Sequence, residues 1–441
     1  MIRLLSMLLL LLAAQAVRAA DPMAGYLMGY FTETPKGSGN SWTLHLATSE
    51  DGLDWMPLNQ NEPVLVPALG QKGLHDPYFL RKQDGGFVVL ATNLTGTTII
   101  SRPEIHVWDT DDFITFRNAR LVKLHDTPMH TLAPEAFFDP DRNQYGVIWS
   151  GDTDYNRIYV NYTTDFTNFG PHEVYFDPGY DVLDATLCPE PVQGGRFLYF
   201  KDAVTRRLRG ARSQTPAPHG FDRDIYTKPI GKNDGQAPLL VKAPQENRWY
   251  LYSESEAWRT DDITRDTWRQ IGRRGFNPPL NAKHSTVIPI TRTEMDRLIG
   301  HWEKPRWSRL KSYNFPDHVV RHENLYCRIS YVSTDPYQDS LWRIVPGLAD
   351  PGGVSFEAVN FPGHYLRTVA EHVMLSKNDD SPAFRTKATF LKVPGLADGS
   401  WSSFRSLTSP ELYLRHANYF LRLEPVKTAI DKEDATFRIV Y

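Results

Sequence analysis

The sequence has little cysteine, no long apolar run beyond its first residues, and no large excess of charge of either sign. Only Cys188 and Cys327 occur in 441 residues, and they are far apart and follow no metal-site spacing. We therefore expect a fold that rests on its hydrophobic core and not on disulfides. Forty-nine basic residues against fifty-two acidic ones argue against nucleic acid as a partner.

The one apolar run stands at the N-terminus. Arg3 precedes the run from Leu4 to Ala16, which is too short to span a bilayer, and Val17-Arg18-Ala19 offers small residues for cleavage. We interpret residues 1–19 as the signal peptide of a secreted or extracellular protein, periplasmic in a Gram-negative host. The alternative is an N-terminal membrane anchor. No later stretch approaches ~18 apolar residues, so we expect a soluble mature chain without a membrane partner.

Helical periodicity is also scarce. Thr293 to Gly300 is the only stretch that we expect to be helical. Short β-rich runs separated by Gly, Pro, Asn and Asp fill the rest, which is typical of an all-β protein.

A turn pattern of Ser or Thr, then Asp, then an aromatic residue recurs through the first 300 residues. It alternates with short segments that contain a polar residue beside Pro, Ala or Ser. The turns are Ser49 to Trp55, Thr110 to Phe116, Thr164 to Phe169, a weaker copy near Phe221, and Thr260 to Trp268. The segments are His75-Asp76-Pro77, Ala133-Pro134-Glu135, Leu183-Asp184-Ala185, Gln236-Ala237-Pro238 and Lys283-His284-Ser285. A spacing of about fifty residues is that of a four-stranded propeller blade, so residues 20–302 are predicted to form a five-bladed β-propeller.

The order of these repeats predicts how the ring closes. Residues 25–58 lack an inner strand of their own, and the last inner segment at His284 lacks outer strands. Pairing the two completes the fifth blade and removes exposed sheet edges.

A second, threefold repeat follows Trp302. Each unit contains a Pro-containing turn, a strand with a conspicuous arginine, and a closing strand. The turns and arginine strands are Asn314-Phe315-Pro316 with Val320-Arg321-His322, Asn360-Phe361-Pro362 with Tyr365-Leu366-Arg367, and Thr408-Ser409-Pro410 with Leu414-Arg415-His416. Residues 303–441 are therefore predicted to form a β-trefoil, with the linker between His301 and Trp307.

These residues resemble two known families. The four segments at Asp76, Glu135, Asp184 and His284 resemble motifs of glycoside hydrolase family 43. The threefold repeat resembles the arabinofuranose-binding module of carbohydrate-binding family 42, whose signature combines Asn-Phe-Pro, Tyr-Leu-Arg-His and a closing Asp-Ala-Thr-Phe.

The first resemblance implies an inverting glycosidase, in which a base activates water and an acid protonates the leaving oxygen. It implies that Asp76 is the base and that Asp184 orients the acid and raises its pKa. The acid position, however, is Gln236, and an amide has no proton to give. Either Glu135 or Asp234 replaces it, or the substrate has a leaving group that needs little protonation, or the propeller only binds sugar.

The resemblance also implies that His284 helps to hold a hydrated Ca²⁺ in the channel, although a hydrogen-bonded core histidine is an equal alternative and no acidic loop supports the metal. No cofactor is expected to be required.

In the trefoil, the second resemblance implies a sugar-binding His and Asp in each lobe. Lobe 1 has His322 and Asp339, and lobe 3 has His416 and Asp434. Lobe 2 has Thr368 and Lys387 at these positions, so its pocket is expected to be inactive.

The leading hypothesis is thus a secreted, monomeric α-L-arabinofuranosidase that acts on arabinan or arabinoxylan and is tethered to it by the trefoil. The alternative is an arabinofuranoside-binding protein that kept the propeller shape. A structural adhesin is disfavoured because Asp76 and Asp184 fall in register on innermost strands.

Overall fold

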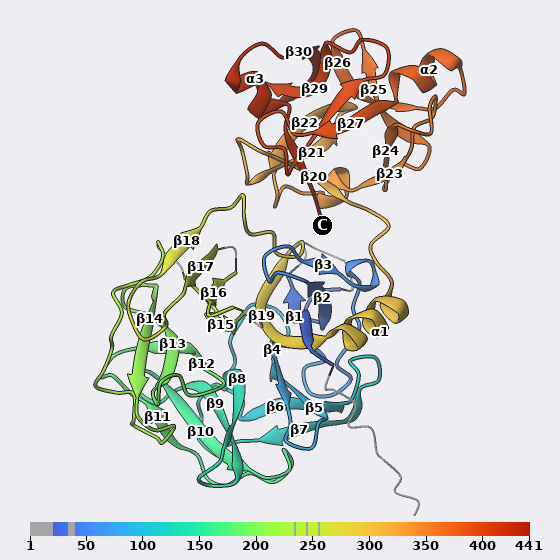
Figure 1. Ribbon diagram of the computed structural model, residues 1–441. Coiled ribbons are helices and arrows are strands. Elements are labelled where there is room, and N and C mark those ends of the chain that lie inside the picture. Colours follow the sequence, from blue (N-terminus) through green and yellow to red (C-terminus); the bar gives the residue numbers. More distant parts are fainter. Residues whose placement is uncertain (1–20, 34–39, 233–234, 244–245, 255) are drawn as a thin grey trace, which may run out of the picture.

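The computed structural model describes residues 21–33, 40–232, 235–243, 246–254 and 256–441. It contains a ring of β-sheets followed by a second β-rich unit (Figure 1). The predicted all-β class, with a five-bladed propeller before a β-trefoil, is confirmed. The predicted signal peptide lies outside the described residues. Within those residues, no helix is long and apolar enough to cross a membrane.

Five antiparallel sheets form the propeller, and each runs from an inner to an outer strand. Blade 1 contains β4 (Leu74–Arg81), β5 (Phe87–Asn93), β6 (Glu104–Thr110) and β7 (Arg117–Lys123). Blade 2 contains β8 (Leu132–Asp139), β9 (Gln144–Asp152), β10 (Asn156–Thr163) and β11 (Glu173–Phe176). Blade 3 contains β12 (Val182–Leu187), β13 (Arg196–Asp202) and β14 (Arg207–Ser213). Blade 4 contains β15 (Leu239–Lys242), β16 (Trp249–Ser253), β17 (Glu256–Thr260) and β18 (Arg269–Ile271).

The fifth blade joins the two ends of the propeller, as predicted. It contains β19 (Ala282–Thr291), β1 (Met23–Thr32), β2 (His45–Ser49) and β3 (Met56–Pro57), followed by the 3₁₀ turn η1 (Asn59–Asn61). Leu27 pairs with Ile288 and Met28 with Val287. The side chains of β1 from Tyr26 onward are buried, so this closure also adds apolar surface to the core.

Blade 3 differs from the sequence expectation, because its fourth strand is irregular. The turn copy near Phe221 is followed by isolated bridges, Ala211 to Ile225 and Leu208 to Ile230, in place of a regular outer strand. Phe221 itself is fully buried. Packing therefore holds this segment where regular pairing is missing.

The recurring turns connect the third and fourth strands of four blades. In the first, Ser49 Oγ accepts a hydrogen bond from the Gly52 amide, and Asp51 Oδ1 accepts from the Leu53 and Asp54 amides. Short Ser and Asp side chains satisfy the turn's backbone donors in this way, which explains why these residue types repeat.

The trefoil has three lobes of four strands around a core that includes Trp342, Phe356 and Phe404. Lobe 1 contains β20 (Arg309–Ser312), β21 (His318–Glu323), β22 (Tyr326–Tyr331), the 3₁₀ turn η2 (Tyr337–Ser340) and β23 (Trp342–Pro346). Lobe 2 contains β24 (Val354–Ala358), β25 (His364–Val369), β26 (His372–Lys377), α2 (Pro382–Lys387) and β27 (Phe390–Pro394). Lobe 3 contains β28 (Ser402–Ser406), β29 (Leu412–Ala417), β30 (Phe420–Pro425), α3 (Ala429–Asp434) and β31 (Phe437–Val440).

The helix expected at Thr293 to Gly300 is present as α1 (Arg292–Trp302), which begins with a capping box between Thr291 and Glu294. The expectation that it is the only helical stretch was wrong, because α2 and α3 also form. Each has six residues, which is too short for a 3.6-residue periodicity to show in the sequence.

The two domains contact each other directly. Leu280 of the propeller packs against Trp307 and Leu341 in a buried apolar cluster. Arg438 of the trefoil forms an ion pair with Asp54 of the fifth blade. Both cysteines are free and buried.

Candidate functional site

One backbone feature repeats at the same level of all five blades. A residue at or just before the start of each inner strand has a left-handed conformation, which costs a non-glycine residue on the order of 1 kcal/mol. In four blades the ladder register also shifts there. The residues are Asp76, Ala133, Asp184, Ala237 and His284, with φ of 51°, 49°, 52°, 50° and 35°. Because neighbouring inner strands contact one another around the ring, these positions form one level of the channel.

Asp76 lies at this level with every carboxylate oxygen engaged. Its Oδ1 is 2.7 Å from His284 Nδ1, and its Oδ2 accepts from Thr92 Oγ1 at 2.7 Å and from the Ala133 amide at 3.2 Å. Burial raises the pKa of Asp76, but the charge of His284 and these hydrogen bonds outweigh it and hold the pKa well below its ordinary value. Asp76 is therefore ionised at neutral pH.

Asp184 occupies the same level two blades further on. Its amide donates to Ser150 Oγ at 3.0 Å, and its Oδ2 accepts from the Ala237 amide at 3.3 Å. Burial raises the pKa of this carboxyl, and the charge of Asp76 adds to the effect while His284 opposes it. The charges of Asp76, Asp184 and His284 therefore influence one another.

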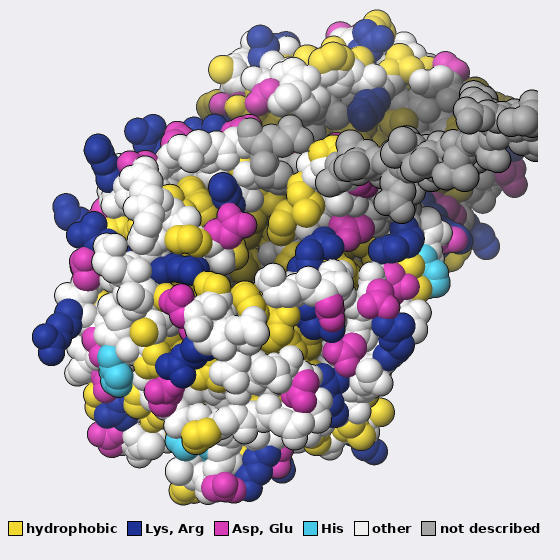
Figure 2. Space-filling view, turned by 60° about the horizontal axis from the view of Figure 1, so that its bottom comes forward, with side chains coloured by type: hydrophobic (Ala, Val, Ile, Leu, Met, Phe, Trp, Pro, Cys, Tyr) yellow, Lys and Arg dark blue, Asp and Glu magenta, His cyan; other side chains and the backbone are white. Residues whose placement is uncertain are grey.

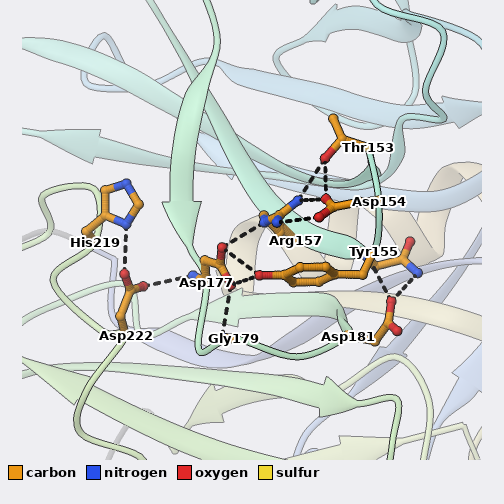
Figure 3. Close-up of polar contacts among 10 residues, drawn as sticks. Thr153, Asp154, Tyr155, Arg157, Asp177, Gly179, Asp181, His219 and Asp222 are labelled. Carbon is orange, nitrogen blue, oxygen red and sulfur yellow. Dashed lines mark hydrogen bonds and ion pairs between the residues drawn. The ribbon is translucent and has the colours of Figure 1, made fainter.

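A network of charged side chains anchors the segment that leads to Asp184 (Figure 3). Arg157 pairs with Asp154 at 2.5 Å and with Asp177 at 2.7 Å. Just before β12, Asp181 Oδ1 accepts from the backbone and side-chain amides of Asn156 at 2.7 and 2.9 Å. The β9–β10 hairpin therefore fixes the start of the strand that carries Asp184.

Glu135 lies on β8, two residues beyond the channel level of Ala133. Its Oε2 is buried without a hydrogen-bond partner. Burial raises the pKa of Glu135 to about 8, although Thr186, His284 and the Leu187 amide act in the opposite direction. Glu135 thus holds a proton at pH 7, whereas Asp76 does not.

Gln236 is exposed, and its backbone N–H donates to Ser253 Oγ at 3.3 Å. Asp234, the other predicted replacement acid, lies outside the described residues.

The next residue after Ser253, Glu254, pairs with Lys283 at 2.9 Å, and sequence analysis missed both members of this pair. Lys283 immediately precedes His284, so its place in the inner-strand repeat was the available signal.

The protonation of His284 is set by its pairing with Asp76. Burial lowers its pKa, but the charge of Asp76 and the hydrogen bond to it raise the pKa to about 9, so the ring is an imidazolium. The described part of the chain holds no group of three or more His, Cys, Asp or Glu side chains placed to bind a metal ion. Ca²⁺ held through water stays a prediction.

Figure 2 shows one face of the propeller in space-filling form. The face is hollowed near its centre, where apolar side chains lie beside acidic and basic ones. A mixed apolar and polar lining of this kind suits a small ligand with many hydroxyl groups.

In lobe 3 of the trefoil, the predicted pair comes together with a third residue from lobe 1. His416 Nε2 is 3.5 Å from Asp434 Oδ1 and 2.9 Å from Asn314 Oδ1. Asn314 Nδ2 in turn donates to Asp434 Oδ1 at 2.7 Å, and Arg415 holds Asp434 Oδ2 at 2.7 Å. The ring of Phe315 meets His416 edge-on at 5.4 Å.

Lobe 1 repeats this arrangement with residues from lobe 2. His322 Nε2 is 3.5 Å from Asp339 Oδ1 and 3.0 Å from Asn360 Oδ1. Arg321 holds Asp339 Oδ2 at 2.6 Å, and Phe361 meets His322 edge-on at 5.3 Å. Each pocket therefore lies between two lobes, and its Asn and Phe come from the Asn-Phe-Pro turn of the following lobe.

Lobe 2 lacks the Asn and Phe of this pocket as well as the His and Asp. Thr368 and Lys387 replace the His and Asp, as predicted, and the following turn supplies Thr408 and Ser409 in place of Asn and Phe. Sequence analysis missed the roles of Asn314 and Asn360, although the altered third turn was a signal for them.

Comparison with known proteins gives the family to which this chain belongs. Residues 21–296 match the family model described as a probable glycosyl hydrolase domain, related to glycoside hydrolase family 43, and the chain belongs to this family. Residues 303–439 match the alpha-L-arabinofuranosidase B (ABFB) domain, which confirms the predicted two-family resemblance.

Individual relatives match over part of their length. An extracellular exo-alpha-(1->5)-L-arabinofuranosidase of Streptomyces avermitilis is 45% identical over 130 residues, 29% of this chain and 27% of that protein. An alpha-L-arabinofuranosidase of Bifidobacterium longum is 24% identical over 198 residues, 38% of this chain and 18% of that protein. The chain thus spans about a quarter of the first relative and less of the second. The structure of an exo-beta-1,3-galactanase from Clostridium thermocellum matches with a TM-score of 0.41 and 10% identity, over 85% of this chain and 99% of that one.

Proposed function

We propose that this protein is a secreted glycoside hydrolase that removes α-L-arabinofuranose from plant polysaccharide, and that its trefoil holds it on the polymer. The observation that carries the proposal is the contrast between two carboxyls in one channel. Asp76 is ionised, whereas Glu135 has a pKa of about 8. Environments that push two carboxyl pKa values apart assign a base and an acid.

The mechanism follows from these protonation states. Ionised Asp76 takes a proton from water as the water attacks the anomeric carbon. Glu135 gives its proton to the leaving oxygen, so the bond to the rest of the polymer breaks without expelling an alkoxide. Attack by water on the face opposite the leaving group inverts the anomeric centre. Asp184, whose pKa is also raised, positions the sugar and tunes the acid.

A second candidate function rests on Gln236. It stands exposed where the family motif places the acid, and an amide cannot protonate a leaving group. If Glu135 does not reach the glycosidic oxygen, the propeller binds arabinofuranosides without cleaving them.

The deciding experiment compares 4-nitrophenyl α-L-arabinofuranoside with arabinan as substrates for the wild type and Asp76→Asn. A hydrolase with both groups cleaves both substrates, and Asp76→Asn abolishes both activities. Turnover of the aryl glycoside alone shows a site without an effective acid, and no turnover of either with intact binding identifies the binding protein.

The comparison needs two controls. Asp76→Asn leaves the His284 charge without its partner, so we expect lower thermal stability, and rates are measured well below the unfolding midpoint. Asp126→Asn changes an exposed carboxyl that pairs with Lys123, and it should behave as the wild type.

The trefoil part of the proposal rests on the two complete sets of contacts in lobes 1 and 3. Two linked pockets raise the effective concentration of a branched polymer at the second pocket once the first is filled. We therefore expect polymers to bind more tightly than single sugars.

A further inference from the structure

A groove runs between the propeller and the trefoil, with a volume of about 360 Å³. Its walls come from both domains: Glu254, Arg273, Phe276 and Lys283 on the propeller side, and Arg309, Lys311 and Asp317 on the trefoil side. This size lies within the range of small-molecule sites, about 300 to 1,000 Å³.

One wall of the groove comes from the residues that lead into β19, the strand that carries His284 of the channel level. Lys283 lines the groove, forms the ion pair with Glu254, and directly precedes His284, the partner of Asp76. The charge of Glu254 also contributes to raising the pKa of His284. A sugar unit in the groove would therefore neighbour a sugar unit in the central pocket.

The trefoil wall of this groove contains two buried cations without an acidic partner. Arg309 is 4% exposed and Lys311 is 6% exposed. Arg309 donates to Ser340 Oγ and the Val332 carbonyl, and Lys311 donates to Asn277 Oδ1 at 2.7 Å and the Arg273 carbonyl. Among the ion pairs of the described residues, none includes either cation.

Nearby charges do not compensate for this burial. Burial, followed by the charges of Arg438, Arg273 and Arg309, lowers the pKa of Lys311 to about 8, and only Asp54 opposes them. Burial alone lowers the pKa of Arg309 to about 10. Positive charge in a protein interior is normally paired, so the groove favours an anion.

The trefoil's own repeat shows that the fold does not require an arginine at the position of Arg309. Strand register places Ser355 of lobe 2 and Ser403 of lobe 3 at the position of Arg309, since the three residues face Val345, Val393 and Val440 respectively. Both serines are fully buried. Lobe 1, which contributes Arg309 to the wall of the groove, is thus the one lobe that buries an arginine at this position.

We infer that the groove binds the carboxylate of an acidic sugar, a uronic acid unit of the polysaccharide, beside the unit held in the central pocket. This inference rests on the proposed function for the polysaccharide but not on hydrolysis. The guanidinium of Arg309 and the ammonium of Lys311 recognise the carboxylate, and Phe276 adds an apolar side chain to the groove wall.

The test is calorimetric titration of the full chain carrying His322→Ala and His416→Ala, so that the trefoil pockets do not contribute. The probes are sodium D-glucuronate and D-galacturonate, their neutral counterparts D-glucose and D-galactose, and sodium acetate. We expect a uronate to bind at least about tenfold more tightly than its neutral counterpart, because a charge-assisted hydrogen bond is stronger than a neutral one. Added salt should reduce this preference.

Two variants in the same background locate the site. Lys311→Gln keeps a hydrogen-bond donor but removes the charge, and Ser333→Asp adds a negative charge at an exposed position of the groove wall. Both should reduce uronate affinity about tenfold. Arg405→Gln is the matched control, because Arg405 occupies the position of Lys311 in lobe 3, and it should leave the affinity unchanged.

Equal affinity for uronate and neutral sugar overturns the inference, as does acetate binding as tightly as uronate or a preference that survives both variants. The readout is binding, so it is independent of turnover. Uronate binding without arabinoside hydrolysis contradicts the proposed activity alone, and hydrolysis without uronate binding contradicts this inference alone.

Discussion

Replacing Glu135 by Gln should raise stability and lower activity at the same time. Its pKa is about 8 in the folded protein against an ordinary 4.5, so at pH 7 the folded form keeps a proton that the unfolded chain has lost. This difference lowers the free energy of unfolding by at most about 3 kcal/mol. The loss begins as the pH rises above 4.5 and is complete above pH 8. Glutamine has no proton to lose, so the variant should gain up to this amount at pH 7 and nothing below pH 4.

The same change removes the proposed proton donor. Hydrolysis of arabinan should fall about 10² to 10⁴-fold, because its sugar leaving groups need protonation. Hydrolysis of 4-nitrophenyl α-L-arabinofuranoside should change little, whereas the decline of kcat/KM for arabinan above pH 8, where Glu135 loses its proton in the wild type, should disappear. The assay is initial rates on both substrates between pH 5 and 9, with unfolding midpoints measured in the same buffers.

Glu173→Gln provides the control, since Glu173 is an exposed carboxyl of the same blade. It should leave both the rates and the stability near the wild type. Unchanged arabinan hydrolysis in Glu135→Gln would refute the acid assignment. A variant that is less stable at pH 8 than the wild type would refute the protonation argument beneath it.

Three further predictions concern other residues. Gln236→Glu should increase hydrolysis of arabinan by supplying a second donor, and a flat or lower initial rate would show that this position does not reach the glycosidic oxygen. His416→Ala should weaken arabinoxylan binding in affinity electrophoresis by more than half, and adding His322→Ala should abolish it. Thr368→Ala should have no effect. A double variant that still binds would rule out both pockets. Burial lowers the pKa of His416 to about 4, so the folded protein resists its protonation. The free energy of unfolding therefore decreases as the pH drops below 6.5. The wild type should lose about 2 kcal/mol more than His416→Gln between pH 7 and pH 5 in chemical unfolding, and parallel losses would contradict the burial argument.

The sequence was sufficient to predict the architecture because both domains repeat. The Ser-Asp turns and the inner segments marked five blades, and the placement of the first turn before Asp76 predicted that β1 completes the last blade. Blade 3 was less accurate, since packing of Phe221 replaces a regular strand there, and packing leaves no periodic pattern.

The sequence singled out candidate site residues one by one but did not predict the contacts between them. Asp76, Asp184 and Glu135 were found because each lies beside the same recurring segment. Asn314 and Asn360 were missed because each serves a pocket whose His and Asp belong to the preceding lobe. Such a contact depends on how the lobes close in space, which a linear repeat does not reveal.

The pairing of β1 with β19 has a consequence for biosynthesis. Met23 is among the first residues of the ring to be made, yet its partner Thr291 follows 268 positions later (291 − 23). At about 5 to 20 residues per second, the wait is roughly 13 to 54 seconds. During that time β1 has only its hairpin partner β2, and its apolar edge is open to other chains. Trimming the N-terminal strand would therefore open the fifth blade and not merely shorten the chain.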